Sequence, residues 1–336
     1  MTVADLEHFK KVLLLRVSSL DSLLESSNSP TEQDTPKVQS LLKEIKEALG
    51  RVEDRSFGQC NLCDGEVEYH RLEVQPAAEI CLDCISEKEK VLLEEELFLA
   101  SKIHRALLPQ SVEKIEGYDI KAISLSARTV GGDYYDILSG KGDSARIIIA
   151  DAMGKGIPAG LIMSNLQGAL RVLSEEIESP SKLLASLNRW LCHNVQVTNF
   201  ISLACVSLNH GLSDESPITY SNAGHCPPIL FRNNGDIESL EPTGGVIGVH
   251  EDFAYEEQLL TISTGDLLLL YTDGVTEAVN KSGEMFGEER LIKYIKEESA
   301  GSAEAFLDGL LNSIRAFSGG EELSDDLTAV AIRKTI

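Results

Sequence analysis

Hydrophobic positions in the first 55 residues form two helical stripes. Apolar side chains recur every three or four positions between residues 3 and 25, and the same spacing returns between residues 38 and 52. Such spacing places apolar side chains on one face of a helix. A polar segment with two prolines, residues 26–36, separates the stripes. The pattern therefore predicts a helical hairpin over residues 1–56.

A third helical pattern covers residues 86–108 and stops before Pro109. It is rich in charge and carries apolar positions at intervals of three or four for about three heptads. We expect a linker helix over residues 86–109, and its apolar stripe would also suit a homodimer in which two such helices pair.

Strand and helix patterns mix from Tyr118 onward. The patterns predict strands at residues 118–124, 145–150, 201–208, 218–221, 229–232, 253–262, 267–271 and 327–333. They predict helices near residues 158–176, 180–197, 288–298 and 303–317. Because no helix interrupts the strands between residues 201 and 271, we expect antiparallel sheets with helices on their outer faces. Residues 110–336 thus form an α+β domain.

The composition of the chain limits the kinds of partner that we expect. The chain has 336 residues and a formal charge of −24, with no basic patch that could contact nucleic acid or anionic lipid. No stretch reaches the roughly 20 apolar residues of a membrane span, and acids at Asp5 and Glu7 do not suit a signal peptide. We therefore expect a cytoplasmic protein that binds neither nucleic acid nor membrane.

Four of the seven cysteines form two C-x-x-C pairs, Cys60/Cys63 and Cys81/Cys84. Four thiolates in this spacing match a tetrahedral structural zinc site, and a segment as short as residues 57–85 needs such a site to hold its fold. A redox dithiol is the rival interpretation, but it would not require two pairs.

Acidic residues follow several apolar or glycine-containing segments. Asp151 comes directly after the apolar run of residues 147–150 and before a glycine-containing turn that leads to Pro158. Asp133, Asp273 and Asp325 have similar settings. Each alone could be a turn former. Clustered carboxylates at strand ends suit hard cations such as Mg²⁺ or Mn²⁺, which can activate a water for attack on phosphorus.

Residues 45–86 resemble the four-cysteine zinc finger of the DksA/TraR family. The likeness rests on Phe57-Gly-Gln-Cys-Asn-Leu-Cys-Asp-Gly-Glu-Val and Cys81-Leu-Asp-Cys84-Ile. In that family the finger stands beside a helical hairpin, and some members bind RNA polymerase. Here six acids and one arginine between residues 57 and 85 make contact with nucleic acid unexpected. We expect a sensory or protein-docking module.

Residues 100–334 resemble the SpoIIE/RsbU-type PPM serine/threonine phosphatases. The motifs are Val130-Gly-Gly-Asp-Tyr-Tyr-Asp136, Ala150-Asp-Ala-Met-Gly-Lys-Gly-Ile-Pro-Ala159, Ser221-Asn-Ala-Gly-His-Cys-Pro227, Tyr271-Thr-Asp-Gly-Val-Thr-Glu277 and Asp325-Asp-Leu-Thr328. The resemblance implies an α-β-β-α sandwich that binds two Mn²⁺ or Mg²⁺ ions.

The same resemblance assigns roles to the site residues. Asp151 would bridge both metals, and the backbone carbonyl of Ala152 would bind one of them. Asp273 and Asp325 would hold the other, with Asp133 near the metal-bound water. Asp325 is preferred over Asp326 because it leads its motif. No protein nucleophile is expected, and His225 is expected to shape its loop rather than to donate a proton.

The function implied is hydrolysis of phosphoserine or phosphothreonine on a regulatory protein. The resemblance indicates that this substrate is an anti-sigma-factor antagonist of the STAS type. It also implies that the N-terminal module regulates the enzyme through the linker helix and the two helices after Pro158. Two alternatives are a signalling scaffold with a weak or silent phosphatase domain and a zinc-finger regulator that binds RNA polymerase.

Overall fold

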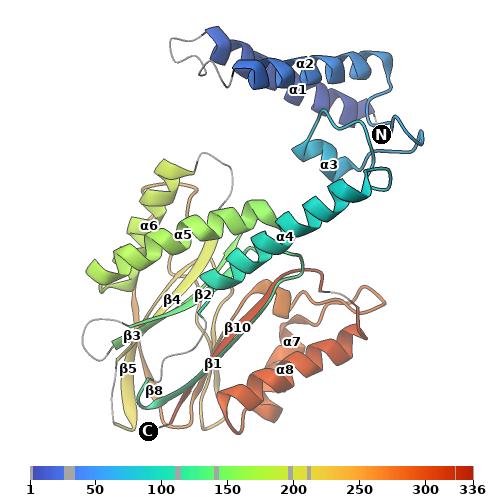
Figure 1. The fold of residues 1–336 in the computed structure, drawn as a ribbon. Helices are drawn as coiled ribbons and strands as arrows, with labels where there is room; N and C mark the ends of the chain where they lie inside the picture. The colour runs from blue at the N-terminus through green and yellow to red at the C-terminus, as the bar shows by residue number, and fades with distance from the viewer. Residues whose placement is uncertain are drawn as a thin grey trace. The chain divides into compact units, whose positions relative to one another are not determined.

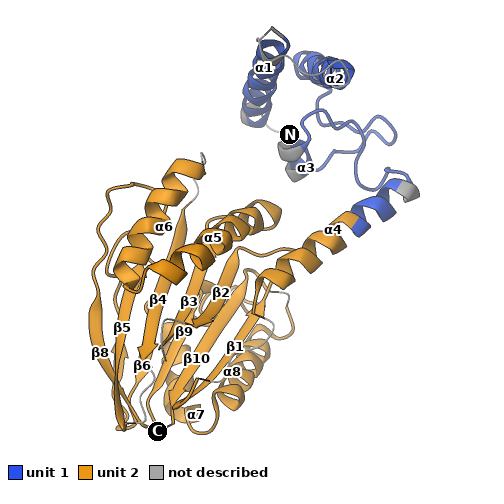
Figure 2. Cartoon of the chain, turned by 60° about the vertical axis from the view of Figure 1, so that its left-hand side comes forward, with its two compact units in different colours: residues 1–95 blue, residues 96–336 orange. Residues whose placement is uncertain are grey.

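A computed structural model describes residues 3–25, 35–109, 115–139, 144–195, 200–209, 213–321 and 323–335. The chain divides into two compact units, residues 1–95 and 96–336 (Figure 2). The boundary falls inside helix α4 (Glu87–Leu107). Each unit has its own hydrophobic core.

The first unit packs a helical hairpin against the cysteine segment. Helices α1 (Val3–Glu25) and α2 (Thr35–Asp54) form the predicted hairpin, and a short helix, α3 (Tyr69–Val74), lies between the two cysteine pairs. The ring of Phe9 on α1 lies 5.3 Å from that of Phe57 and 5.2 Å from that of Tyr69, centroid to centroid. The hairpin and the cysteine segment therefore share one core.

The second unit contains two five-stranded antiparallel sheets (Figure 1). One has the order β1-β10-β9-β6-β7 and the other β2-β3-β4-β5-β8. The strands of the first are β1 (Tyr118–Leu125), β10 (Leu327–Lys334), β9 (Leu267–Tyr271), β6 (Ile229–Phe231) and β7 (Ile237–Ser239). Those of the second are β2 (Asp133–Ser139), β3 (Ser144–Ala152), β4 (Ile201–Asn209), β5 (Glu215–Ala223) and β8 (Gln258–Ser263).

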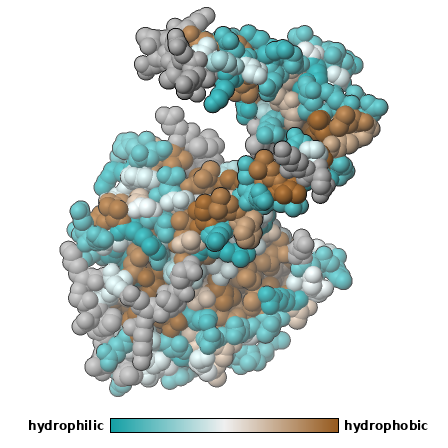
Figure 3. Space-filling view, viewed as in Figure 1, coloured by the Kyte–Doolittle hydropathy of each residue, from teal (hydrophilic) through white to brown (hydrophobic). Residues whose placement is uncertain are grey.

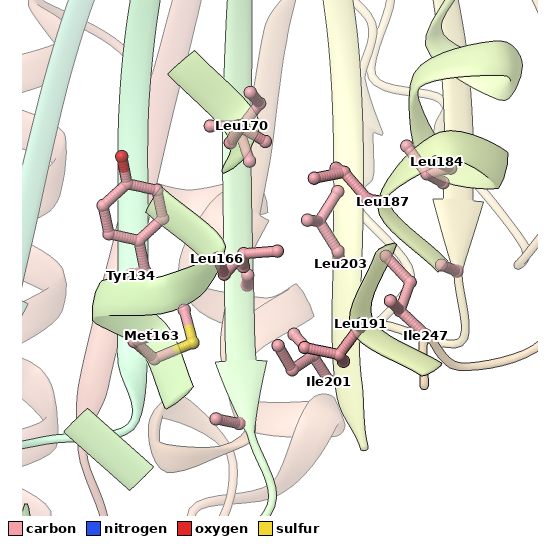
Figure 4. Packing of buried hydrophobic residues seen from close by; sticks show 14 of the residues in the cluster. Tyr134, Met163, Leu166, Leu170, Leu184, Leu187, Leu191, Ile201, Leu203 and Ile247 are labelled. Carbon is pink, nitrogen blue, oxygen red and sulfur yellow. The ribbon is translucent and has the colours of Figure 1, made fainter. Parts of the chain in front are cut away.

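Helices cover the outer face of each sheet, which completes the predicted α-β-β-α sandwich (Figure 1). Helices α5 (Ile157–Glu176) and α6 (Pro180–Asn194) pack on the β2–β8 sheet, where Leu166, Leu187 and Leu203 interdigitate (Figure 4). Helices α7 (Gly287–Glu298) and α8 (Ala303–Ser318) pack on the other sheet. A third apolar cluster fills the space between the sheets.

Alternation along β3 explains its uninterrupted apolar run. Ile148 and Ala150 face the α5/α6 layer, whereas Ile147 and Ile149 face the space between the sheets. Both faces of the strand are covered, so no polar position is needed before its end. By the same alternation Asp151 points toward the space between the sheets.

Most predicted elements are present, but two strands and the short helix α3 were missed, and two predicted boundaries differ. Strand β2 was not predicted, because its Gly-Gly-Asp-Tyr-Tyr-Asp motif reads as a loop; β7 is only three residues long and was also missed. The strand expected at residues 253–262 begins at Gln258 instead, since a turn ends at Asp252 and residues 253–257 have no regular secondary structure. Helix α6 ends at Asn194, and residues 196 and 197 of the predicted helix lie outside the described residues.

Among the described residues, no helix has both the length and the apolar character required to cross a bilayer.

A carboxylate site at one end of the sandwich

Asp133 and Asp151 are brought together by the register of β2 and β3. They are paired positions in this antiparallel ladder, so their side chains share a face of the sheet. That face is the one between the two sheets, because Tyr135 and Ile149, two residues along each strand, belong to the inter-sheet cluster. Both carboxylates thus lie at one end of the sandwich interior.

The opposing sheet supplies the other carboxylates. Strand β9 ends at Tyr271, and a short 3₁₀ turn (Asp273–Val275) follows it. Thr272 lies between them, and its hydroxyl donates a 2.7 Å hydrogen bond to Oδ2 of Asp133. The same hydroxyl accepts the backbone N–H of Thr328 at 2.9 Å. One buried threonine therefore connects β2 of one sheet with β9 and β10 of the other.

The two neighbouring aspartates before β10 have different surroundings. Asp326 is buried, and its carboxylate accepts the backbone N–H groups of Ala127 at 2.7 Å and Gly132 at 2.6 Å. Asp325 is partly exposed and forms an ion pair with Lys155, with 2.7 Å between Nζ and Oδ2. Asp326 thus holds the segment before β2 in place, and Asp325 faces the turn after β3.

Glycines let the chain approach closely around Ala152. Gly154 and Gly156 have φ values of +107° and +74°, which side chains rarely adopt, so the turn between β3 and α5 depends on them. A Cβ on Gly132 would lie 2.9 Å from the carbonyl oxygen of Ala152. The backbone N–H of Ala152 in turn donates to the Gly132 carbonyl at 3.1 Å. The Ala152 carbonyl is therefore beside the segment that carries Asp133.

The carboxylates raise one another's pKa values. Burial, together with the charges of Asp273, Asp325 and Asp326, raises the pKa of Asp151 to about 7. Burial and the charge of Asp151 raise the pKa of Asp133 well above its usual range. Burial and the neighbouring Glu277 and Asp325 raise the pKa of Asp273 as well. The site therefore concentrates negative charge, which Lys155 offsets only in part.

This donor set fits hard divalent cations. The ligand atoms are oxygens, and the accumulated charge is unfavourable in a buried site without a compensating cation. Among the described residues, only the four cysteine thiols form a group of three or more ligand atoms all within 4.8 Å of one another. The carboxylate oxygens are therefore more widely spaced than the ligands of a closed cage.

His225 is held inside its loop and is neutral near physiological pH. Its Nδ1 lies 2.8 Å from the hydroxyl of Ser202, and its backbone N–H donates to Oδ1 of Asn222 at 2.7 Å. Burial lowers the pKa of the imidazole to about 4. These contacts agree with the expectation that His225 shapes the loop.

Several residues of the site were not singled out from the sequence. Thr272, Thr328 and Lys155 were passed over, although Thr272 and Thr328 occupy inward-facing positions that strand alternation identifies. Lys155 lies between two glycines of the turn, where no periodic pattern in the sequence marks it as part of the site.

In the first unit, the four predicted thiols converge. The Sγ atoms of Cys60, Cys63, Cys81 and Cys84 all lie within 4.8 Å of one another. Backbone bonds shape the site: the N–H of Cys60 donates to the Gly65 carbonyl at 2.7 Å, and the N–H of Cys81 donates to Sγ of Cys60 at 3.3 Å. Such N–H···S contacts are typical of thiolate ligands, and the cluster fits a tetrahedral metal.

Three comparisons with known proteins agree with this geometry. The family model described as stage II sporulation protein E (SpoIIE) matches residues 141–335. The phosphoserine phosphatase RsbU of Bacillus subtilis is 33% identical over 245 residues, which cover 73% of this chain and 71% of RsbU. The SiaA-PP2C domain of Pseudomonas aeruginosa superimposes with a TM-score of 0.65 at 18% identity, over 74% of this chain and 99% of that domain, a likeness of fold.

The cysteine segment has a separate relative. The RNA polymerase-binding transcription factor DksA of Escherichia coli strain K12 is 44% identical over 48 residues, which cover 14% of this chain and 32% of DksA. This short match concerns the finger and not the whole of DksA. By its fold, its site and these relatives, the chain belongs to the SpoIIE family of PPM-type protein serine/threonine phosphatases, with a DksA-like four-cysteine finger in its N-terminal unit.

Proposed function

We propose that this phosphatase hydrolyses phosphoserine and phosphothreonine on a regulatory protein with the help of two divalent cations, Mn²⁺ or Mg²⁺. The observation that carries the proposal is the convergence of carboxylates from both sheets at one end of the sandwich.

We assign the roles as follows. Asp151 would be a ligand shared by both ions, the Ala152 carbonyl would hold one of them, and Asp273 and Asp325 would hold the other, with Asp133 placed to orient the attacking water. Bound divalent ions polarise phosphate oxygens and lower the pKa of water, so no protein nucleophile is required.

The chain's own residues then hold this arrangement. Thr272 fixes the orientation of Asp133 through its 2.7 Å hydrogen bond. Asp326 anchors the segment before Asp133 by accepting two backbone N–H groups, so it supports the site and does not bind metal. Lys155 is paired with Asp325 and limits the charge of the site.

Substitution of Asp273 tests the assignment. Asp273→Asn should lower kcat/KM for a phosphoserine peptide in the presence of Mn²⁺ by about 100-fold or more, since a neutral amide is a poor ligand for a hard cation. Asp252→Asn, at an exposed position, is the matched control and should leave turnover unchanged. Wild-type turnover in Asp273→Asn would contradict the metal assignment.

For the substrate, we propose a phosphorylated anti-sigma-factor antagonist of the STAS type. The support is the 33% identity with RsbU, a phosphoserine phosphatase. The purified enzyme should dephosphorylate such an antagonist with a higher kcat/KM than a peptide that carries the same phosphoserine, because the folded protein adds binding surface. Equal values for the two substrates would argue against a dedicated protein target.

We further propose that residues 1–56 (the hairpin), 57–85 (a finger that binds one zinc ion) and 86–109 (the linker) form a regulatory module for the phosphatase domain, residues 110–336. Within the second unit, the C-terminal part of α4 lies close to the site segments. His104 is buried near the carbonyl of Gly131, and Gln167 of α5 donates to the Leu107 carbonyl at 2.8 Å. Movement of α4 would thus shift α5 and the segment that carries Asp133.

The linker helix also supports our proposal of a homodimer. Apolar side chains gather on the surface over α4 and α5 (Figure 3), and Phe98, Ile103 and Leu161 are 72%, 57% and 61% exposed. An exposed apolar surface of this kind is typical of an interface. Light scattering should therefore give twice the chain mass for the wild type and a monomer for Phe98→Glu; a wild-type monomer would refute the dimer.

A further inference from the structure

A basic cleft lies in the second unit, apart from the carboxylates. It has a volume of about 460 Å³ and is bounded by α4, the segment between β1 and β2, and the end of α8. Its lining includes Arg105, Arg128 and Arg315, and among the described residues that line it there is no aspartate or glutamate. In a chain with 54 acids and 30 basic residues, such a lining marks a place suited to an anion.

The three arginines come from three different elements. Arg105 is on α4, Arg128 precedes the Gly131-Gly132 pair, and Arg315 is in the last turn of α8. Within the described residues, the guanidinium groups of Arg128 and Arg315 form neither an ion pair nor a hydrogen bond. Each guanidinium group carries five N–H donors, and those of Arg128 and Arg315 are thus available to a ligand.

Hydroxyl and apolar groups complete the lining. Ser126 and Thr129 add hydroxyl donors beside Arg128, and Leu108 and Leu125 add apolar wall. Guanidinium and hydroxyl groups together are the usual partners of phosphate oxygens. The volume lies in the range of small-molecule sites, roughly 300–1,000 Å³, and exceeds what a lone phosphate would fill.

The cleft borders the segment that carries Asp133. Ser126, Arg128 and Thr129 lie in the stretch whose Ala127 and Gly132 N–H groups donate to Asp326. Arg128 also approaches the turn after β3, since a Cβ on Gly156 would be 3.8 Å from its Cδ. A ligand in the cleft would therefore contact α4, α8 and this stretch together.

We propose that this cleft is an effector site that binds a small phosphate-bearing molecule of nucleotide size. Basic side chains from three elements around a concave space favour a compact ligand over an extended acidic peptide, which would need a longer basic stripe. The site is separate from the catalytic carboxylates, none of which lines it.

Calorimetric titration of the full-length, metal-loaded protein with adenosine monophosphate tests the proposal. We expect saturable binding with one site per chain, retained in Asp273→Asn, which removes a catalytic carboxylate and prevents turnover of the probe. Arg105→Gln combined with Arg315→Gln should weaken binding by about tenfold or more, because two of the three positive charges that line the cleft are lost. The control Arg189→Gln, an exposed arginine on α6, should bind as the wild type does.

Other probes define the ligand class. Adenosine should not bind, and inorganic phosphate should bind more weakly than the nucleotide. Unchanged affinity in the double variant, equal binding of adenosine, or loss of binding in Asp273→Asn would each overturn the proposal. Tighter binding of a hexaglutamate peptide, sensitive to the same two arginines, would assign the cleft to a protein segment instead.

If the glutamine variant does not fold, Arg105→Lys with Arg315→Lys replaces it; this variant should still weaken binding, since lysine cannot form the bidentate contact.

Discussion

The hydroxyl of Thr272 connects the two sheets at the carboxylate site. Thr272→Val keeps the shape of the side chain and removes the hydroxyl, so Asp133 loses the hydrogen bond from Thr272 and the Thr328 N–H loses its side-chain acceptor. We expect kcat to fall about 10–100-fold and the Mn²⁺ concentration for half-activation to rise. Steady-state phosphatase assays over a Mn²⁺ titration measure both.

Thr272→Ser is the matched control for that change. It keeps the hydroxyl and should retain most of the turnover, although it leaves a small cavity in the core. If Thr272→Val has the Mn²⁺ dependence of the wild type, the hydroxyl does not contribute to metal binding, and Thr272 serves only to fill space in the core.

His225 should make stability depend on pH. Its folded-state pKa of about 4 lies below the ordinary value of 6.5, so folding favours the neutral imidazole. The stabilisation is complete above pH 6.5 and is lost as the pH falls from 6.5 toward 4. Between pH 7 and pH 5 we expect a loss on the order of 2 kcal/mol from this residue.

Urea unfolding at both pH values, compared between wild type and His225→Asn, isolates this contribution from those of other titrating groups. The variant should lose less stability on acidification than the wild type. Parallel pH profiles would show that the imidazole titrates normally.

At the scale of elements, α5 contains two glycines in opposite situations. A Cβ on Gly160 would lie 2.2 Å from Cγ1 of Val130, whereas a Cβ on Gly168 would have no atom within 4 Å. Gly168→Ala should raise the free energy of unfolding by up to about 1 kcal/mol, because alanine is the better helix former. Gly160→Ala should lower it by about 1–3 kcal/mol, because Val130 must move.

The same pair tests how α5 affects catalysis. Val130 directly precedes the Gly131-Gly132 segment, so Gly160→Ala should also reduce turnover, and Gly168→Ala should not. Urea denaturation and phosphatase assays on both variants provide the comparison. Equal behaviour of the two variants would contradict the close packing at Gly160.

The elements also show what the sequence could predict. The apolar run before Asp151 identified β3 and the position of its terminal carboxylate, because a strand covered on both faces has a distinctive composition. Strand β2 was hidden, since the two glycines before it and Asp133 at its start displace the usual apolar alternation. The pairing of Asp133 with Asp151 and the hydrogen bond from Thr272 depend on register and on the meeting of two sheets. Neither follows from local sequence.

At the scale of the whole molecule, the two units have separate cores. The core of the first unit includes two cysteines, Cys60 and Cys81, whereas the clusters of the second unit are formed by its sheets and helices. A small unit whose core includes metal ligands depends on the metal for much of its stability. Zinc loss should therefore affect the first unit far more than the second.

Cys84→Ser separates stability from regulation. We expect zinc content to fall from one ion per chain to much less than one, and calorimetry to show early melting of the first unit while the transition of the phosphatase domain is retained. Cys192→Ser, a thiol on α6 outside the cluster, is the control and should leave zinc content unchanged.

If the first unit regulates the enzyme, Cys84→Ser should also change kcat for the phosphoprotein substrate, because α4 begins in that unit and continues beside α5. Loss of zinc and of the first transition with an unaltered kcat would leave the finger as a structural part without a role in control.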